Sequence, residues 1–301
     1  MDKHEINGRR FLAVTLLNAT ITVVEIIGGV VSGSLALLSD AFHNLGDSLS
    51  IVMGYFAQTI SGKPENSRRT FGYRRAEILS AFLNALFLIV MSIFLIVEAI
   101  QRLEKPTPIN GKVMLIVAII GLIANLLSAI LLHEGSHDSL NIKATYLHVL
   151  SDSLSSVAVI IGAIILMYVN VPWLDPLLTI AVAIYIAFEA WPIVKKTIEI
   201  LMQSAPQLNY EQIEHDILAI EGVKNIHHIH AWSMDEHRII FSAHINCRDM
   251  KISECEPIYH QIEQLLSTKY NISHITLQAE CQRGRDEKMF DTNDDEVHLC
   301  Q

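Results

Sequence analysis

Two segments about a hundred residues apart carry the same pair of metal-ligating side chains at the same spacing. His43 and Asp47 stand four residues apart in a run that is otherwise apolar, and His148 and Asp152 repeat that spacing. Seven of the ten positions from 43 to 52 are identical to those from 148 to 157. On a helix, residues at i and i+4 share a face with Cβ atoms about 6 Å apart. Each segment should therefore present an imidazole and a carboxylate side by side.

The four side chains together offer two nitrogen and two oxygen ligands. Imidazole and carboxylate suit a borderline divalent ion such as zinc, and four ligands suit its tetrahedral preference. Ionisable groups inside membrane segments are unfavourable and usually mark an ion path or a proton relay. The pattern predicts one metal site, made by His43, Asp47, His148 and Asp152 on two transmembrane helices. The alternative is a polar helix interface in which imidazole and carboxylate merely satisfy each other.

The two segments lie in the second and fifth of six apolar stretches. The chain has 301 residues, 51% of them hydrophobic, and a positive mean hydropathy, which is too apolar for an ordinary soluble domain. Each stretch is long enough to cross a hydrocarbon core of ~30 Å at 1.5 Å per residue. The second and fifth should be the least apolar, because they face an internal site. The stretches are Phe11–Val31, Leu35–Ile60, Ile78–Ile100, Val113–Leu132, Ala144–Val169 and Leu174–Val194.

Basic residues predict the orientation, since cytoplasmic loops are enriched in lysine and arginine. They gather before the first stretch, between the second and third, and after the sixth. Residues 1–10 are therefore expected to form a cytoplasmic N-terminus and residues 11–200 a six-helix domain in the inner (cytoplasmic) membrane. The C-terminal part should also be cytoplasmic. The basic residues on this side are Lys3, Arg9, Arg10, Lys63, Arg68, Arg69, Arg74, Arg75, Lys195 and Lys196.

After Pro206 the sequence changes to that of a soluble domain. Residues 206–283 predict an α+β module of order αββαβ, similar to ferredoxin-like and metallochaperone domains. Residues 284–301 are acidic and lack apolar periodicity, which is typical of a disordered tail. The net charge of −10 argues against nucleic acid as a partner. The predicted elements are helices at Tyr210–Ile220 and Ser253–Lys269 and strands at Asn225–Trp232, Arg238–Asn246 and Ile272–Glu280.

With the paired His-x-x-x-Asp segments, six spans and a histidine-bearing αββαβ domain in place, the chain resembles the cation diffusion facilitator family. The likeness extends over Gly28–Asp40, Thr70–Glu77 and His274–Glu280, and is greatest to the zinc-exporting branch typified by ZitB and CzcD. The resemblance implies a homodimer that exchanges cytoplasmic Zn²⁺ for protons, with Cd²⁺ or Co²⁺ as secondary substrates. It also implies a transporter without enzymatic activity and without an organic cofactor.

The resemblance also places metal ligands in the cytoplasmic domain. His227 and His244 align with family ligands, while Gln278 and Glu280 stand where other members have His and Asp. His227, His244 and Glu280 are therefore expected to form a regulatory metal site. Strand alternation would send the neighbouring His228 to the opposite side of the strand from His227.

One acidic residue beside the transport motif has two interpretations. Asp40 lies three residues before His43 and so near its face. It either accepts a hydrogen bond from the imidazole or relays protons, or it caps the start of its helix.

Two rival functions remain. An intramembrane zinc enzyme would need an open coordination position and a general base. The sequence His-Glu-x-x-His occurs at His133–His137, between the fourth and fifth apolar stretches rather than within one of them. A membrane metal sensor would bind Zn²⁺ without transporting it.

Overall fold

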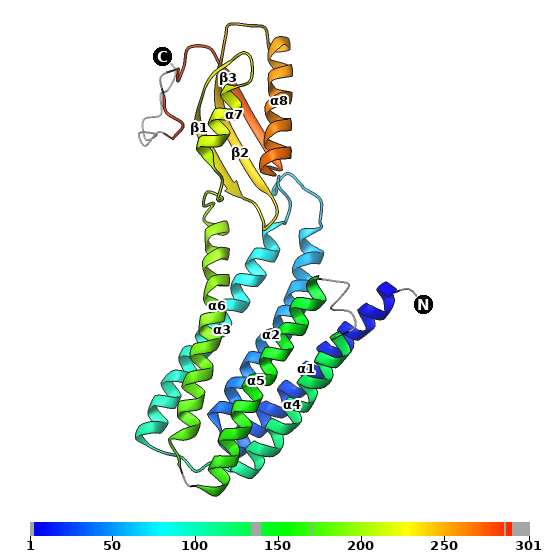
Figure 1. Cartoon of the computed structure of the whole chain (residues 1–301), viewed down its shortest axis with the longest axis vertical. Coiled ribbons are helices and arrows are strands. Elements are labelled where there is room, and N and C mark those ends of the chain that lie inside the picture. The colour runs from blue at the N-terminus through cyan, green and yellow to red at the C-terminus, as the bar shows by residue number, and fades with distance from the viewer. Residues whose placement is uncertain (1–2, 134–139, 170, 286, 291–301) are drawn as a thin grey trace. The chain divides into compact units, whose positions relative to one another are not determined.

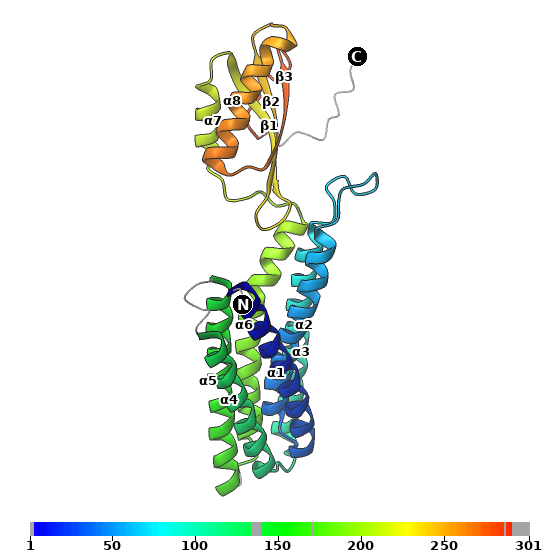
Figure 2. The same cartoon turned by 90° about the vertical axis from the view of Figure 1, so that its right-hand side faces the viewer.

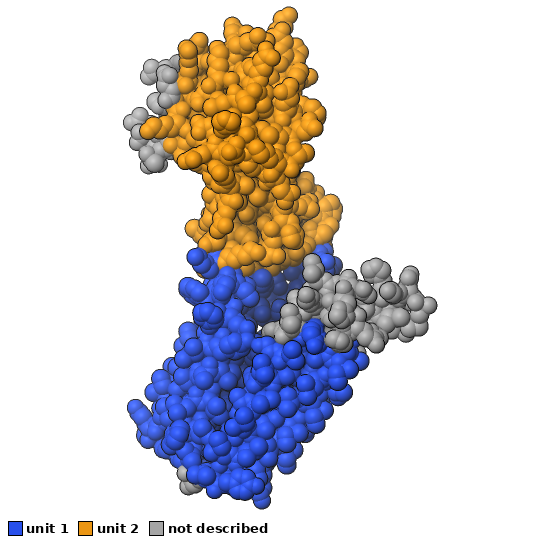
Figure 3. All heavy atoms as spheres, viewed as in Figure 1, with its two compact units in different colours: residues 1–59, 79–195 blue, residues 60–78, 196–301 orange. Residues whose placement is uncertain are grey.

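The computed structural model describes residues 3–133, 140–169, 171–285 and 287–290 (Figure 1). Within its helices, the side chains of residues 3–13, 132–133, 140–145 and 147–148 are also outside the description. The chain separates into two compact units, coloured in Figure 3. Residues 1–59 and 79–195 form the first, called the membrane unit, and residues 60–78 and 196–301 form the second.

Among the described residues, six long helices make up the membrane unit, and three of them extend into the residues of the second unit. They confirm the predicted helical membrane-type fold. Their bounds are α1 Lys3–Ser32, α2 Leu35–Ser61, α3 Arg75–Glu104, α4 Gly111–His133, α5 Leu140–Tyr168 and α6 Leu174–Leu201.

Apolarity distinguishes α2 from the other helices. Among the described residues, five helices (α1, α3, α4, α5 and α6) are long and apolar enough to cross a membrane. Helix α2 is 27 residues long but is not among these five, as expected for a helix that is interrupted by polar residues and faces an internal site. The segment of α5 that qualifies as a membrane span, Val149–Tyr168, begins after residues 144–148 of the predicted fifth stretch. The low apolarity of the whole fifth stretch therefore stays a prediction.

Two apolar clusters set the positions of the helices. In one cluster, Ala36 and Leu37 of α2 pack with Met114 of α4 and with Val159 and Ala163 of α5. In Figures 1 and 2, α4 and α5 run side by side. The other cluster joins α3 to α6 through Ala85, Leu88, Ile186, Ala190 and Val194. Large aliphatic and aromatic side chains stay exposed on every one of these helices, as expected where lipid covers the outer surface.

The start of α2 is fixed by a buried carboxylate of α6. Gly33, at φ 74°, forms the turn from α1 into α2, a conformation that glycine adopts without strain. The Asp175 carboxylate then accepts hydrogen bonds from the Leu35 amide at 2.8 Å, the Ala36 amide at 3.3 Å and the Ser34 hydroxyl. A negative charge at a helix N-terminus satisfies free amides and complements the helix dipole. Asp175 therefore anchors the helix that carries His43.

The second unit contains the soluble domain, in the predicted order αββαβ. Its elements are α7 Tyr210–Leu218, β1 Val223–Ser233, β2 Ile239–Cys247, α8 Ile252–Tyr270 and β3 His274–Glu280. Strand β2 lies in the centre of the sheet, antiparallel to β1 and parallel to β3. Figure 2 shows α7 and α8 together on one side of this sheet.

The two faces of the sheet differ in chemical character. Isoleucines and leucines of α7 and α8 pack on Ile226, Phe241, Ala243 and Ile245 to form the core. On the other face two rows of paired residues cross the strands. His227 pairs with His244 and His244 with Gln278, while Asn225 pairs with Asn246 and Asn246 with Glu280. The polar face thus gathers imidazole, amide and carboxylate groups.

Candidate metal sites

Helix α2 presents the first pair of ligands predicted for the transport site. His43 and Asp47 are one helical turn apart, and the distance from His43 Nε2 to Asp47 Oδ2 is 3.9 Å. His43 is buried and Asp47 is half-buried. The i,i+4 spacing therefore brings the two groups together on one face of the helix.

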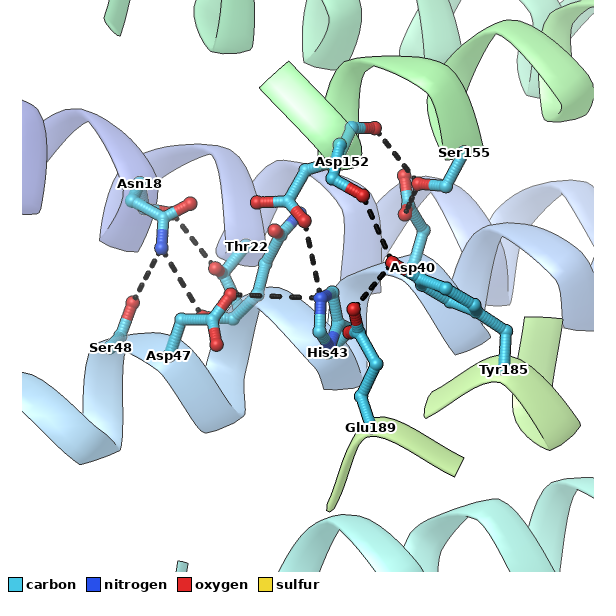
Figure 4. Close-up of polar contacts among 12 residues, drawn as sticks. Asn18, Thr22, Asp40, His43, Asp47, Ser48, Asp152, Ser155, Tyr185 and Glu189 are labelled. Carbon is cyan, nitrogen blue, oxygen red and sulfur yellow. Dashed lines mark hydrogen bonds and ion pairs between the residues drawn. The ribbon is translucent and has the colours of Figure 1, made fainter. Parts of the chain in front are cut away.

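Helix α5 supplies a carboxylate to the same point. Asp152 Oδ1 lies 3.3 Å from His43 Nε2, across 109 residues of sequence, and Asp152 is also buried. Figure 4 shows Asp47 and Asp152 approaching the His43 ring from different helices. Ligand atoms of His43, Asp47 and Asp152 all lie within 4.8 Å of one another.

These distances fit a tetrahedral zinc ion. Zinc binds imidazole nitrogen and carboxylate oxygen at about 2.0–2.2 Å, so neighbouring ligand atoms of a tetrahedral site are about 3.3–3.6 Å apart. The His43–Asp152 distance of 3.3 Å agrees with this value, and the His43–Asp47 distance of 3.9 Å is slightly longer. A buried and a half-buried carboxylate beside one buried imidazole also require a cation or protons, because uncompensated charge in an apolar interior is highly unfavourable.

The fourth predicted ligand, His148, has its backbone in α5, one turn before Asp152. Its side chain lies outside the described residues.

Asp40 makes contacts that the sequence interpretation did not foresee. Its carboxylate is buried and accepts hydrogen bonds from Ser155 Oγ at 2.8 Å and Ser156 Oγ at 3.2 Å, both on α5. Figure 4 shows the Ser155 contact beside His43. The serine-rich stretch after Asp152 was the available signal, since hydroxyl groups on a buried helix face usually have a partner on another helix. Asp40 therefore ties α2 to α5 next to the candidate site.

Two further polar contacts surround the site. Tyr185 Oη donates to Glu189 Oε1 at 2.6 Å and lies 2.9 Å from the Ser151 hydroxyl, adjacent to Asp152 (Figure 4). Asn44, adjacent to His43, donates to the fully buried Glu25 at 2.8 Å. Sequence reasoning missed both networks, because they depend on packing between helices. The i,i+4 spacing of Tyr185 and Glu189 was a signal in the sequence for one of them.

The second candidate site lies on the polar face of the cytoplasmic sheet. Ligand atoms of His227, His244 and Glu280 lie within 4.8 Å of one another. Glu280 is between the two imidazoles, with its oxygens 3.3 Å from His227 Nε2 and 3.3 Å from His244 Nδ1. Gln278 donates to Glu280 at 2.6 Å and orients it. Each 3.3 Å distance is close to the separation of neighbouring tetrahedral zinc ligands, and the two distances involve different oxygens of Glu280.

The electrostatics of this site favour neutral imidazole. Burial lowers the pKa of His244 and outweighs the Glu280 carboxylate, which raises it. A neutral imidazole is the form that binds a metal. His227 is only 1% exposed, and its Nδ1 has no hydrogen-bond partner among the described residues.

Strict alternation along β1 is not observed, and the expectation for His228 is wrong. The register shifts between His227 and His230, and His228 adopts a left-handed φ of 52°. This bulge turns the His228 ring so that it stacks on His244 at a centroid distance of 4.6 Å, with its Nε2 3.2 Å from that of His230. A bulge inserts an extra residue and re-aims the following side chains, so His227 and His228 both lie beside His244.

The remaining predicted features fall largely outside the description. The predicted acidic tail begins at residue 284, but the structure describes residues 284–285 and 287–290. The carbonyls of residues 284, 285 and 287 accept from Asn225 of β1. Residues 291–301 lie outside the described part of the chain, as do residues 1–2 of the predicted N-terminal segment 1–10.

Comparison with known proteins covers both units. Residues 11–202 match the cation efflux transmembrane domain, and residues 205–282 match the cytoplasmic domain of cation efflux proteins. A zinc transporter ZitB from Pectobacterium atrosepticum is 40% identical over 93% of this chain and 88% of its own length. A cadmium, cobalt and zinc/H⁺-K⁺ antiporter from Bacillus subtilis is also 40% identical, with the same coverage. The metal cation efflux system protein CzcD of Cupriavidus metallidurans is 36% identical over 92% and 88%.

Proposed function

Since the chain belongs to the cation efflux family and is a membrane metal-efflux transporter, we propose that it exports Zn²⁺ from the cytoplasm in exchange for protons. The observation that carries this proposal is the convergence of His43, Asp47 and Asp152 from two helices at zinc-like separations. His148 is the fourth ligand of the proposed transport site. Relatives named for cadmium, cobalt and zinc support Cd²⁺ and Co²⁺ as secondary substrates.

The exchange follows from the ligand types. A metal-bound histidine must be deprotonated, so Zn²⁺ and protons compete for His43 and His148. Histidine suits this competition because its unperturbed pKa of ~6.5 is near physiological pH. Asp47 and Asp152 neutralise the two charges of the ion, which makes its burial energetically acceptable. A site opened to the far side of the membrane then loses Zn²⁺ to incoming protons.

Asp40 is proposed to support this step. It is buried close to His43 and is held by two hydroxyls of α5. From there it either keeps α2 and α5 in register around the ion or passes protons to the site. In either role, movement of α2 relative to α5 would change the contacts between Asp40 and the two serines.

Alternating access would take place in a homodimer in the inner membrane, with both termini cytoplasmic. The match of residues 205–282 to the cytoplasmic domain of cation efflux proteins supports this orientation, and the lysine and arginine distribution agrees with it. Zn²⁺ at His227, His244 and Glu280 would act as a regulatory ion. It can favour transport only by binding more tightly to one of the two conformations.

The experiment is Zn²⁺ uptake into proteoliposomes under an imposed pH gradient. Gradient-driven flux that is lost in Asp152→Ala supports both the exchange and the transport site. Asp249→Ala is the matched control, because it makes the same substitution at an exposed position of the cytoplasmic unit.

The competing function is a membrane metal sensor, which the same preparation addresses. A sensor would bind Zn²⁺ through the same ligands but show no flux under either direction of the gradient. Saturable Zn²⁺ binding without flux would therefore refute the transporter proposal and favour the sensor.

A further inference from the structure

The chain after β3 returns across the polar face of the cytoplasmic sheet. We call residues 283–285 and 287–289 the strap. Asn246 Nδ2 donates to the Arg283 carbonyl at 2.7 Å. Asn225 Nδ2 lies within 3.1–3.3 Å of the carbonyls of residues 284, 285 and 287. The Ile229 amide donates to the Met289 carbonyl at 3.2 Å, and the Met289 side chain packs on the core. Two asparagines of the sheet thus hold the strap over the row that contains His227 and His244.

The strap brings a second carboxylate to the buried imidazole. Glu287 Oε2 lies 3.8 Å from His227 Nε2, the same nitrogen that is 3.3 Å from Glu280 Oε2. Gly284 of the strap, at φ +65°, also lies against this nitrogen. A Cβ atom on Gly284 would lie 2.0 Å from Nε2, about the length of a zinc–nitrogen bond. That position is about 1.5 Å from Gly284 Cα, so the strap backbone covers the coordination position of Nε2, and an ion that binds there displaces Gly284.

Charge gives an independent reason for a fourth ligand. His227, His244 and Glu280 together carry one negative charge when both imidazoles are neutral, which leaves a bound dication half compensated. Glu287 adds the second negative charge, so that two nitrogens and two oxygens, the composition proposed for the transport site, together balance the charge of a dication. Gln278, which pairs with His244 in the sheet, is neutral and supplies no charge.

We propose that Glu287 is the fourth ligand of the cytoplasmic site and that metal binding there fastens the strap to the sheet. The inference rests on the proposed regulatory site. Three ligands are on β-strands, whereas Glu287 is on the strap and its side chain is 47% exposed. Its 3.8 Å distance exceeds the tetrahedral separation of about 3.3–3.6 Å. Glu287 therefore moves inward by about 0.2–0.5 Å when the ion binds, and the neighbouring residues of the strap change position with it.

The test uses the full-length protein in nanodiscs with Asp47→Ala and Asp152→Ala, so that only the cytoplasmic site can bind Zn²⁺. Calorimetric titration with Zn²⁺ is combined with amide hydrogen exchange in peptides covering residues 283–290. In this background Zn²⁺ should bind and slow exchange in the strap. Adding Glu287→Gln should weaken binding at least tenfold and abolish the slowing in the strap, while Zn²⁺ still protects the strands. Glu263→Gln, an exposed carboxylate of α8, is the matched control.

Each outcome decides the proposal. Zn²⁺ affinity and strap protection that are unchanged by Glu287→Gln would refute the fourth ligand and leave the three-residue site standing. An absence of Zn²⁺ binding in the Asp47→Ala, Asp152→Ala background would refute the cytoplasmic site and the fourth ligand together. Neither result bears on transport, which the proteoliposome flux decides separately. Exchange of the metal-free Glu287→Gln variant shows whether the domain stays folded.

Discussion

Asp175 should be a major stabilising residue of the membrane unit, because it holds the start of α2. The perturbation is Asp175→Ala, with Asp175→Asn as the conservative variant. The carboxylate is fully buried and accepts hydrogen bonds from Ser34, Leu35 and Ala36. Alanine removes all three acceptor contacts, whereas asparagine keeps one acceptor oxygen and loses the charge.

The magnitude follows from these contacts. A hydrogen bond to a charged group contributes about 1.5–3 kcal/mol, and a buried amide left without an acceptor costs about 1–3 kcal/mol. These contributions overlap, and loss of a helix cap alone costs about 0.5–2 kcal/mol. We therefore expect Asp175→Ala to lower the free energy of unfolding by about 2–5 kcal/mol, and Asp175→Asn by about half as much. At ~2–4 °C per kcal/mol, the melting temperature of the alanine variant falls by roughly 4–20 °C.

The assay is thermal unfolding in detergent, followed by size-exclusion chromatography. A chelator is present, because bound Zn²⁺ would add its own stabilisation. Glu104→Gln is the control, since it removes an exposed carboxylate at the end of α3. If Asp175→Ala melts with the wild type, or if asparagine is as damaging as alanine, the capping argument is wrong.

Three further substitutions test the two sites and the cytoplasmic fold. His43→Asp replaces an imidazole with a harder ligand, so competition binding should show Mn²⁺ gaining relative to Zn²⁺; an unchanged ratio contradicts the ligand assignment. Hydrogen bonds from Lys269, and to a smaller extent from Tyr270, hold the pKa of Asp216 below its ordinary value. The ionised Asp216 therefore stabilises the folded state above the unfolded pKa of about 3.9, and this stabilisation is lost as the pH falls through the lower folded pKa. Asp216→Asn should unfold at lower urea than wild type at pH 7, and the difference should shrink with acidification; a difference independent of pH would count against the ion pair. Gly284→Ala places a Cβ against His227 at a positive φ, so calorimetry should show weaker Zn²⁺ binding to the cytoplasmic domain, and wild-type affinity would mean that the strap does not lie there.

Much of the fold could be predicted from local sequence patterns. The length of the apolar stretches indicated the membrane helices, and alternation between apolar and polar residues indicated the three strands. These patterns arise because each element buries one face or all of its surface, so its period is visible in the residues themselves. The same argument covers contacts within one helix, such as His43 with Asp47.

Contacts between elements required the tertiary structure. The approach of His43 to Asp152 and the bonds from two serines to Asp40 depend on how α2 packs against α5. The turn of His228 depends on a register shift between β1 and β2, which alternation cannot predict. Glu287 reaches His227 only because the strap crosses the sheet. Sequence periodicity thus determined the elements and which faces carry ligands, whereas packing between distant segments decided which ligands meet, because non-local contacts leave no periodic signal along the chain.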